Sequence, residues 1–218
     1  MIHYINGLEA QVEALLCAYP RLNRTKDSRS AVVISGSIDV NKCFNDFTVA
    51  QSYNLEIHIP KSEEKLPNVV DVGHHIMRDY PHLYSDRTLC LATETDIRFR
   101  YIQGFDLVDW MGTYVENYYY SYEYYQRYGV FPFGERGHGN KGVLETYQEI
   151  FDVNSTTAAK NVLDYIVSHK KYRGHHLCPC YSGKKIRDCH KEIILHFLQD
   201  PTLLSLLVQD YNNTFSRR

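Results

Sequence analysis

The chain lacks any run of 18 or more apolar residues, so we expect no segment that crosses a membrane. Its first residues lack a basic stretch followed by an apolar block, which argues against a secretory signal. It also lacks the phosphate-cradling pattern Gly-x-x-x-x-Gly-Lys, internal repeats and low-complexity segments. We therefore expect a cytoplasmic protein that does not adenylate its own substrate.

The formal net charge is only -2, which argues against general nucleic-acid binding while leaving local basic patches open. Hydrophobic residues make up 44% of the chain and charged residues 23%, so a real core is expected rather than disorder. The length of 218 residues suits one large domain, or one domain of ordinary size with a small module attached.

The most informative motif is a cluster of metal-binding residue types near the C-terminus, with the spacing Cys-x-Cys-x8-Cys-His: Cys178, Cys180, Cys189 and His190. Three thiolates and one imidazole are the ligand types and the ligand number of a tetrahedral zinc site. Protein side chains would occupy all four coordination positions of the metal. The sequence therefore predicts structural Zn²⁺ rather than catalytic metal. Basic residues inside the loop would offset the single negative charge of that centre: Lys184, Lys185 and Arg187. Free thiols or a disulfide are the alternative.

Residues 176–190 resemble the SEC-C motif, which has the pattern Cys-x-Cys-x8-Cys followed by Cys or His. Four further positions also match it: Pro179, Ser182, Gly183 and Lys184. The resemblance implies zinc and often a role in partner contact, but it implies no particular activity.

Hydrophobic periodicity predicts an α+β fold. Apolar residues at steps of three and four between positions 5 and 16 indicate a first helix, which the polar run 23–30 ends. Alternating patterns over residues 31–40 and 53–60 predict strands, and residues 70–76 continue this rhythm into a third or fourth strand. Short strands without intervening helices indicate a four-strand antiparallel meander.

After residue 105 the pattern is helical again. Asp106 is the expected N-cap of a helix that carries Leu107 to Tyr118, and eight tyrosines lie between residues 114 and 128. These tyrosines favour packing, with a protein interface such as a homodimer as the alternative. We expect a glycine-rich loop over residues 134–142, helices at 143–151 and 159–167, and two short helices separated at Pro201. The expected domains are residues 1–152 and 153–218.

Three cysteines lie outside the metal motif. Cys90 stands between Leu89 and Leu91, so in an extended segment it points away from the face that the leucines occupy. If that face is the core, Cys90 faces solvent, which is unusual for a free cysteine. Cys17 adjoins the apolar face of the first helix and is expected to pack there, while Cys43, in an expected turn, remains open.

Residues 1–150 resemble a ubiquitin-conjugating enzyme. The shared order is an N-terminal helix, a four-strand meander, a stretch containing Ile59-Pro60 and Leu66-Pro67, a histidine shortly before Leu89-Cys90-Leu91, and a long helix. This resemblance implies that Cys90 accepts the C-terminus of a ubiquitin-like protein as a thioester and passes it to an amine.

The chain is more closely similar to conjugating-enzyme proteins of bacterial anti-phage (CBASS) operons. The similarity lies in Asp109-Trp110, in the tyrosine-rich residues 122–129 and in residues 133–139. It implies a cGAS-like nucleotidyltransferase as an alternative protein partner, bound through its C-terminal tail. Either a separate activating enzyme or a self-activated partner is then needed.

The motif upstream of Cys90 departs from the family pattern. Conjugating enzymes carry His-Pro-Asn there, with Asn steadying the oxyanion, whereas this chain reads His82-Leu83-Tyr84. Backbone N–H groups or another side chain must then stabilise the oxyanion. His82 is the candidate catalytic residue, and a structural role in tying down the loop is its alternative. Asp86 or Asp96 could accept the proton of the incoming amine.

Two other functions remain open. The missing Asn favours a non-catalytic module of the same fold that only binds a partner. A papain-like hydrolase pairing Cys90 with His138 is the third reading, but such nucleophiles usually lie at a helix N-terminus. His74 and His75 are expected on a strand in structural roles.

Overall fold

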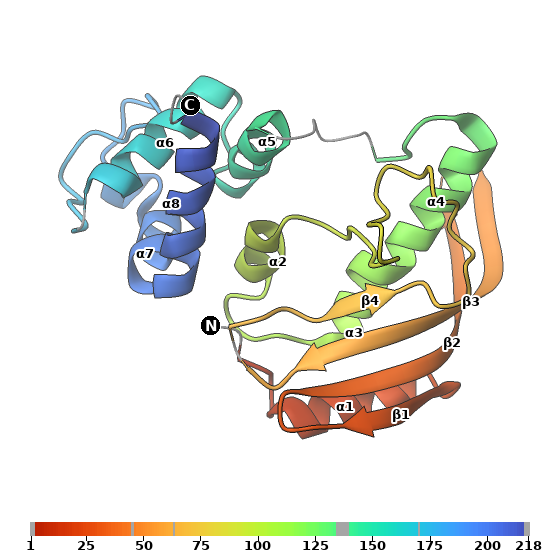
Figure 1. Cartoon of the computed structure of the whole chain (residues 1–218). Helices are drawn as coiled ribbons and strands as arrows, with labels where there is room; N and C mark the ends of the chain where they lie inside the picture. Colours follow the sequence, from red (N-terminus) through yellow and green to blue (C-terminus); the bar gives the residue numbers. More distant parts are fainter. Residues whose placement is uncertain (1–2, 45, 63, 134–139, 170, 216–218) are drawn as a thin grey trace. The chain divides into compact units, whose positions relative to one another are not determined.

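The computed structural model describes residues 3–44, 46–62, 64–133, 140–169 and 171–215. As predicted, the fold is α+β, with an N-terminal helix, a four-strand antiparallel sheet and C-terminal helices (Figure 1). Within these ranges, no helix is both long and apolar enough to cross a membrane.

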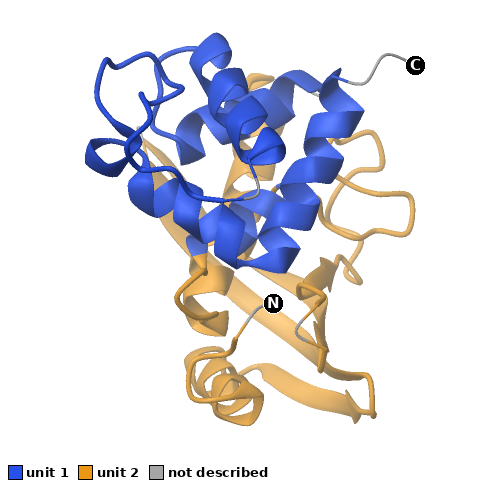
Figure 2. Ribbon diagram, turned by 90° about the vertical axis from the view of Figure 1, so that its left-hand side faces the viewer, with its two compact units in different colours: residues 1, 93–100, 135–218 blue, residues 2–92, 101–134 orange. Residues whose placement is uncertain are grey.

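The chain divides into two compact units (Figure 2). The sheet unit comprises residues 2–92 and 101–134, and the helical unit comprises residues 1, 93–100 and 135–218. This division differs from the expected boundary between residues 152 and 153. Tyr147 and Phe151 pack their rings against Phe197, with centroids 6.2 and 5.9 Å apart, so the segment around them belongs with the C-terminal helices.

The sheet has the order β1-β2-β3-β4, with each neighbouring pair antiparallel. The strands are β1 (Leu22–Asp27), β2 (Ala31–Phe44), β3 (Phe47–Pro60) and β4 (Asn68–Val70). Directly opposed residues share a face, and the pairs Val32 with Ile59 and Ile34 with Ile57 are fully buried. The predicted alternation therefore forms one apolar face of the sheet.

Two parts of the sheet differ from the sequence prediction. Strand β1 lies in the polar run that was expected only to end the first helix. The sequence did not predict it because it is an edge strand on which only Leu22 is buried, so its residues need no apolar alternation. His74 and His75 lie in a loop rather than on a strand. The carboxylate of Asp71 accepts hydrogen bonds from the N–H groups of His75 and Ile76, which turns the chain away from the sheet after β4.

Helix α1 (Leu8–Ala18) buries Gln11, Val12 and Leu15. The prediction that Cys17 packs in the core is wrong, because its side chain lies on the exposed side of this helix. Cys43 lies within β2 and is also exposed.

The expected helix after residue 105 is present and capped as predicted. The Asp106 carboxylate accepts hydrogen bonds from the N–H groups of Val108 and Asp109, both at 2.9 Å. This helix consists of α3 (Leu107–Trp110), a π-helical turn (Met111–Val115) and α4 (Glu116–Tyr128). Four α4 tyrosines are buried against the rest of the unit: Tyr118, Tyr119, Tyr120 and Tyr122.

The helical unit contains α2 (Glu94–Arg100), α5 (Asn140–Ile150), α6 (Thr156–Ser168), α7 (Lys191–Gln199) and α8 (Pro201–Phe215). The short helix α2 was not predicted. Of the expected glycine-rich loop, residues 134–139 lie outside the described residues and residues 140–142 belong to α5. Pro201 begins α8, which Asp200 separates from α7, as predicted.

Candidate functional site

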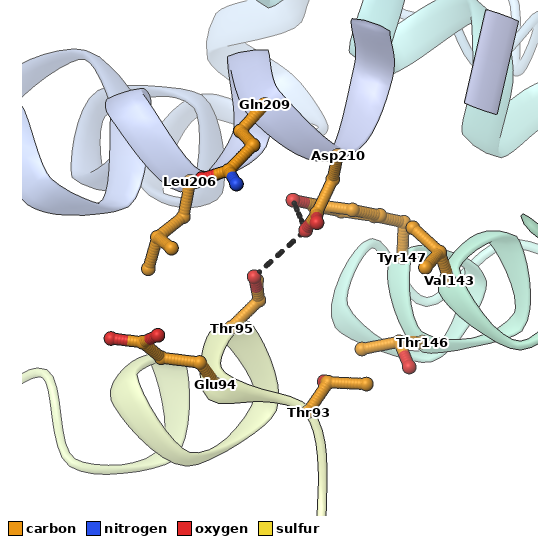
Figure 3. A pocket seen from close by; sticks show the side chains of 9 residues that line it. All are labelled: Thr93, Glu94, Thr95, Val143, Thr146, Tyr147, Leu206, Gln209 and Asp210. Carbon is orange, nitrogen blue, oxygen red and sulfur yellow. Dashed lines mark hydrogen bonds between the residues drawn. The ribbon is translucent and has the colours of Figure 1, made fainter. Parts of the chain in front are cut away.

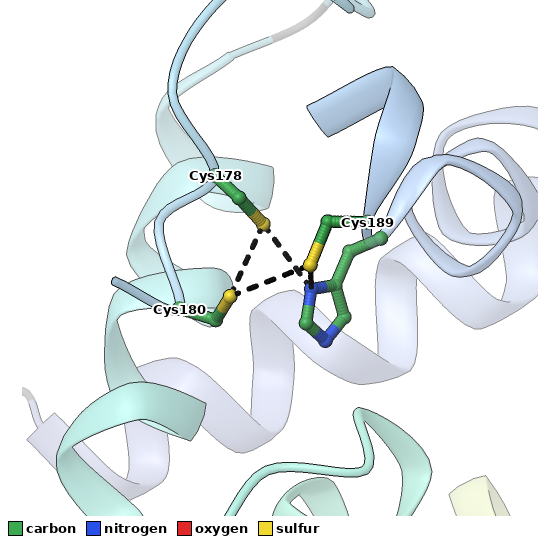
Figure 4. Close-up of side chains that lie close together, drawn as sticks. Cys178, Cys180 and Cys189 are labelled. Carbon is green, nitrogen blue, oxygen red and sulfur yellow. Dashed lines mark hydrogen bonds between the residues drawn. The ribbon is translucent and has the colours of Figure 1, made fainter. Parts of the chain in front are cut away.

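The first candidate site is the predicted metal cluster (Figure 4). The ligand atoms of Cys178, Cys180, Cys189 and His190 all lie within 4.8 Å of one another. The Cys180 sulfur is 3.4 Å from that of Cys178 and 3.6 Å from that of Cys189. His190 Nδ1 is 3.1 Å from the sulfurs of both Cys178 and Cys189.

These separations fit zinc. Zinc bonds of about 2.3 Å to sulfur and about 2.1 Å to nitrogen give a tetrahedron whose edges are roughly 3.5–3.8 Å. Three of the separations, 3.1, 3.1 and 3.4 Å, are shorter than these edges, and a small outward movement of those atoms would accommodate the ion. The sulfur separations also exceed the roughly 2.05 Å of a disulfide bond, and all six cysteines are free.

A short hairpin holds the ligands in place. Leu177 pairs with Lys185, and the N–H of Cys178 donates to the carbonyl of Lys184 at 2.8 Å. Gly183 has a φ of 75°, a left-handed conformation that glycine adopts readily in a tight turn. A 3₁₀ turn (Ile186–Asp188) then leads to Cys189. The first residue of this turn, Ile186, is fully buried.

His190 reaches the cluster from a buried position. Its Nε2 lies 2.6 Å from the carbonyl oxygen of Phe151 and so donates the ring proton there. In the neutral imidazole this hydrogen bond makes Nδ1, which is directed at the sulfurs, the nitrogen available to a metal, the usual outer-shell arrangement of a metal-binding histidine. The Phe151 carbonyl is a supporting group that the sequence pattern could not reveal.

The thiols of the cluster differ in acidity. Burial raises the pKa of Cys178 to about 12, so its thiolate is unfavourable unless a cation lies beside it. Burial also acts to raise the pKa of Cys180, but hydrogen bonds with Ser182, Cys178 and Cys189 together outweigh it and lower the value to about 7. A divalent cation would hold both sulfurs as thiolates.

The second candidate site surrounds Cys90, which lies half-buried immediately after the buried Leu89. The hydroxyl of Tyr84 lies 3.6 Å from the Cys90 sulfur and donates toward it. Residues 83 and 89 form a bridge, and the N–H of Cys90 donates to the carbonyl of His82 at 2.8 Å. This small hairpin presents the hydroxyl and the thiol side by side.

A buried ion pair fixes the base of that hairpin. Arg87 bonds the Asp71 carboxylate and also donates to the carbonyls of Asp71 at 3.0 Å and Ile76 at 2.7 Å. The Asp71 side chain is fully buried and that of Arg87 is 10% exposed. Arg87 has a φ of 69°, uncommon for a residue with a side chain, and these contacts stabilise it.

Helix α4 supports the loop that leads to Cys90. Tyr118 donates to the carbonyl of His82 at 2.9 Å, and Tyr122 donates to the carbonyl of His75 at 3.1 Å. Burial raises the pKa of both phenols, so both remain hydrogen-bond donors at neutral pH. Part of the tyrosine-rich region therefore acts as scaffold for this segment.

The other expected site residues take different positions. The His82 ring packs against Phe131 and Tyr80, with centroids 5.1 and 5.7 Å away. The Asp86 carboxylate accepts a hydrogen bond from the N–H of Thr88 at 3.0 Å, which lowers its pKa and stabilises the turn. Asp96 belongs to the helical unit.

Two further points concern residues around the proposed nucleophile. His138 lies outside the described residues. Tyr84 contacts the Cys90 sulfur, and sequence reasoning did not single it out. Its place in His82-Leu83-Tyr84, where conjugating enzymes carry Asn, was the signal that could have identified it.

A third location is a polar pocket of the helical unit, between α2, α5 and α8 (Figure 3). Asp210 accepts hydrogen bonds there from Thr95 at 3.0 Å and from Tyr147 at 2.9 Å. Glu94, on its rim, accepts one from Arg98 at 2.8 Å. The Asp210 carboxylate joins α8 to α2 and α5, and Glu94 pairs within α2, so we interpret the pocket as a polar junction within the unit.

No protein-family model matches the chain, and no curated protein or solved structure matches it either. We therefore derive a function from the metal cluster and the Cys90 segment, together with the sequence resemblances above.

Proposed function

We propose that this protein is a cysteine-dependent conjugating enzyme that carries the C-terminus of a partner protein as a thioester on Cys90 and transfers it to an amine. The observation that supports the proposal is the pairing of a half-buried thiol with the hydroxyl of Tyr84, 3.6 Å away. By resemblance, the partner is a cGAS-like nucleotidyltransferase or a ubiquitin-like protein, and the setting is anti-phage defence.

The reaction needs two acyl transfers. The Cys90 thiolate first attacks the activated C-terminal carbonyl of the partner, and the activating group leaves as the C–S bond forms. A neutral amine of the acceptor then attacks the thioester carbonyl and forms a tetrahedral oxyanion. Collapse of that intermediate breaks the C–S bond, the amine proton passes to solvent or a nearby base, and an amide is released with the free thiol.

Tyr84 fits the role of hydrogen-bond donor to the oxyanion. It is 57% exposed, so a carbonyl bound at Cys90 can reach its hydroxyl. The hydrogen bond to Cys90, the electrostatic interaction between the two groups and partial burial raise the pKa of Tyr84 to about 12, so the hydroxyl keeps its proton at neutral pH. A preorganised donor aimed at developing charge is the usual means of accelerating acyl transfer.

We assign His82 a positioning role. Its carbonyl accepts hydrogen bonds from both the Cys90 N–H and the Tyr118 hydroxyl, so it joins the nucleophile's backbone to helix α4. Its ring packs among aromatic side chains. Zn²⁺ held by Cys178, Cys180, Cys189 and His190 would stabilise the C-terminal hairpin and take no part in the acyl transfer.

Intact-mass measurement tests the proposal. The purified protein is mixed with the candidate partner and, where needed, an activating enzyme and ATP, and is then analysed with and without thiol reductant. We expect a reductant-sensitive adduct with the mass of the partner minus water. It should be absent in Cys90→Ala and become a reductant-resistant ester in Cys90→Ser. Cys43→Ser, which changes another exposed cysteine, is the matched control and should still form the adduct.

Other outcomes would point to the remaining functions. A stable complex without an adduct would favour a binding module of this fold, a reading that the missing Asn and the partial burial of Cys90 support. Release of a shortened partner, with Cys90 required, would favour a hydrolase. Either result would overturn the transferase proposal.

A further inference from the structure

The metal hairpin and the residues flanking it carry a net positive charge, although the net charge of the whole chain is close to zero. Residues 170–191 contain seven of the chain's 24 Lys and Arg residues but only one of its 26 Asp and Glu residues. The seven are Lys170, Lys171, Arg173, Lys184, Lys185, Arg187 and Lys191. Even with a zinc centre of charge -1, this segment is strongly basic while the rest of the chain is acidic.

Among the residues that the structure describes, some of these cations have a carboxylate partner and others have none. Arg187 lies 3.5 Å from Asp188, and Lys191 lies 3.2 Å from Glu192. In contrast, no carboxylate in the part of the chain that the structure describes forms an ion pair with Lys171, Lys184 or Lys185. All three side chains are exposed. Such cations are available for an anionic ligand.

Two large apolar side chains stand out from the same hairpin. Tyr181 is 79% exposed and Leu177 is 72% exposed, the two highest values among the large hydrophobic residues described. Leu177 pairs directly with Lys185 across the hairpin, so an apolar side chain and a cation share one face. Tyr181 lies at the turn between Cys180 and Ser182, where its φ is 63°.

We propose that this hairpin binds single-stranded nucleic acid, with Tyr181 stacking on a base and the unpaired lysines contacting phosphates. An exposed aromatic ring among cations is the usual arrangement of a single-strand binding surface. The abundance of lysine favours phosphate over an acidic protein, because protein interfaces are depleted in lysine. This inference does not depend on the thioester chemistry of Cys90.

Fluorescence anisotropy with labelled 20-nucleotide oligo-dT and oligo-U tests the proposal and distinguishes DNA from RNA. We expect binding whose logarithm falls with the logarithm of salt concentration with a slope of about -2 to -3, as three or four phosphate contacts would give. Lys184→Ala combined with Lys185→Ala should make the slope shallower by about 1.4. The matched control is Lys141→Ala combined with Lys160→Ala. Those lysines belong to the same unit but pair with Glu145 and Asp164, so the slope should not change.

The aromatic contact has its own test. Tyr181→Asn, which tolerates the positive φ, should weaken binding about fivefold to hundredfold, whereas Tyr181→Phe should keep it. The zinc content of every variant is measured first and should be one per chain. This control distinguishes unfolding of the hairpin from loss of a single contact with nucleic acid. Absence of binding to both oligonucleotides at 50 mM salt would overturn the proposal. Equal binding of poly-glutamate would also overturn it, in favour of an acidic protein partner.

Discussion

The metal cluster and the Cys90 segment differ in the sequence separation between the site residues and the residues that support them. The four ligands of the cluster fall between residues 178 and 190 and are held by their own hairpin, to which the hydrogen bond between His190 and Phe151 adds a contact across 39 residues. The Cys90 segment depends on Arg87 with Asp71, Tyr118 with His82, and Tyr122 with His75, contacts that span 16, 36 and 47 residues. A short motif therefore specifies the first site, whereas the second exists only once the sheet unit has folded.

Removal of the metal should produce the largest effect on the local region. Structural zinc contributes about 10–16 kcal/mol to the folding of zinc-finger peptides, and this hairpin has a comparable ligand set. We expect Cys178→Ser, or a strong chelator, to abolish the amide hydrogen-exchange protection of residues 174–190. The sheet unit should keep its protection. Zinc content measured by mass spectrometry would fall from one per chain toward zero.

Cys17→Ser is the control for that experiment, because Cys17 is an exposed cysteine of helix α1. It should leave both zinc content and exchange unchanged. Unaltered protection of the hairpin after complete chelation would show that its backbone contacts suffice without metal, and would remove the contrast between the two sites.

The same contrast explains how much could be predicted from the sequence. The ligand set, strands β2 and β3 and the Asp106 cap follow from residue types at fixed spacing, and all are present. Strand β1 was missed because an exposed edge strand needs no apolar alternation. The Asp71–Arg87 pair could not be predicted, because no local pattern indicates which buried acid meets which base.

Disruption of that ion pair should be the next largest effect. Asp71→Ala leaves Arg87 buried without its partner and two N–H groups without an acceptor, and should lower the free energy of unfolding by about 3–5 kcal/mol. Urea denaturation followed by tyrosine fluorescence measures it. The rate at which Cys90 reacts with a thiol reagent should rise in parallel, because its hairpin is loosened.

Asp86→Ala is the matched control, since Asp86 lies in the same hairpin but is exposed and bonds only the turn. We expect a loss of about 1 kcal/mol or less, typical of a single exposed hydrogen bond. Equal losses from the two substitutions would mean that the turn, and not the buried pair, holds the Cys90 segment.

Tyr84→Phe separates chemistry from scaffold within the same segment. If Tyr84 stabilises the oxyanion, the rate of thioester discharge from Cys90 to free lysine should fall by about 10²–10³. Stability should change little, because the hydroxyl is accessible to water and the ring is retained. Single-turnover discharge assays at constant thioester loading measure the rate.

Tyr128→Phe removes the hydroxyl of another exposed tyrosine, on helix α4, and should leave discharge unchanged. A Tyr84→Phe variant that loads and discharges normally would transfer the oxyanion role to backbone N–H groups. The proposal for Cys90 itself would survive that result, since loading depends on the thiol.

The smallest effect is expected from a contact that is entirely local. Ser155 caps helix α6, where its hydroxyl accepts a hydrogen bond from the N–H of Ala158 at 3.1 Å. Ser155→Ala should lower the free energy of unfolding by about 1 kcal/mol, and Ser155→Asp should restore it because Asp is an equally good cap. A loss as large as that of Asp71→Ala would contradict the ranking. It would mean that helix α6 is stabilised by its first turn and not by its buried face of Ala159, Val162, Leu163, Tyr165 and Ile166.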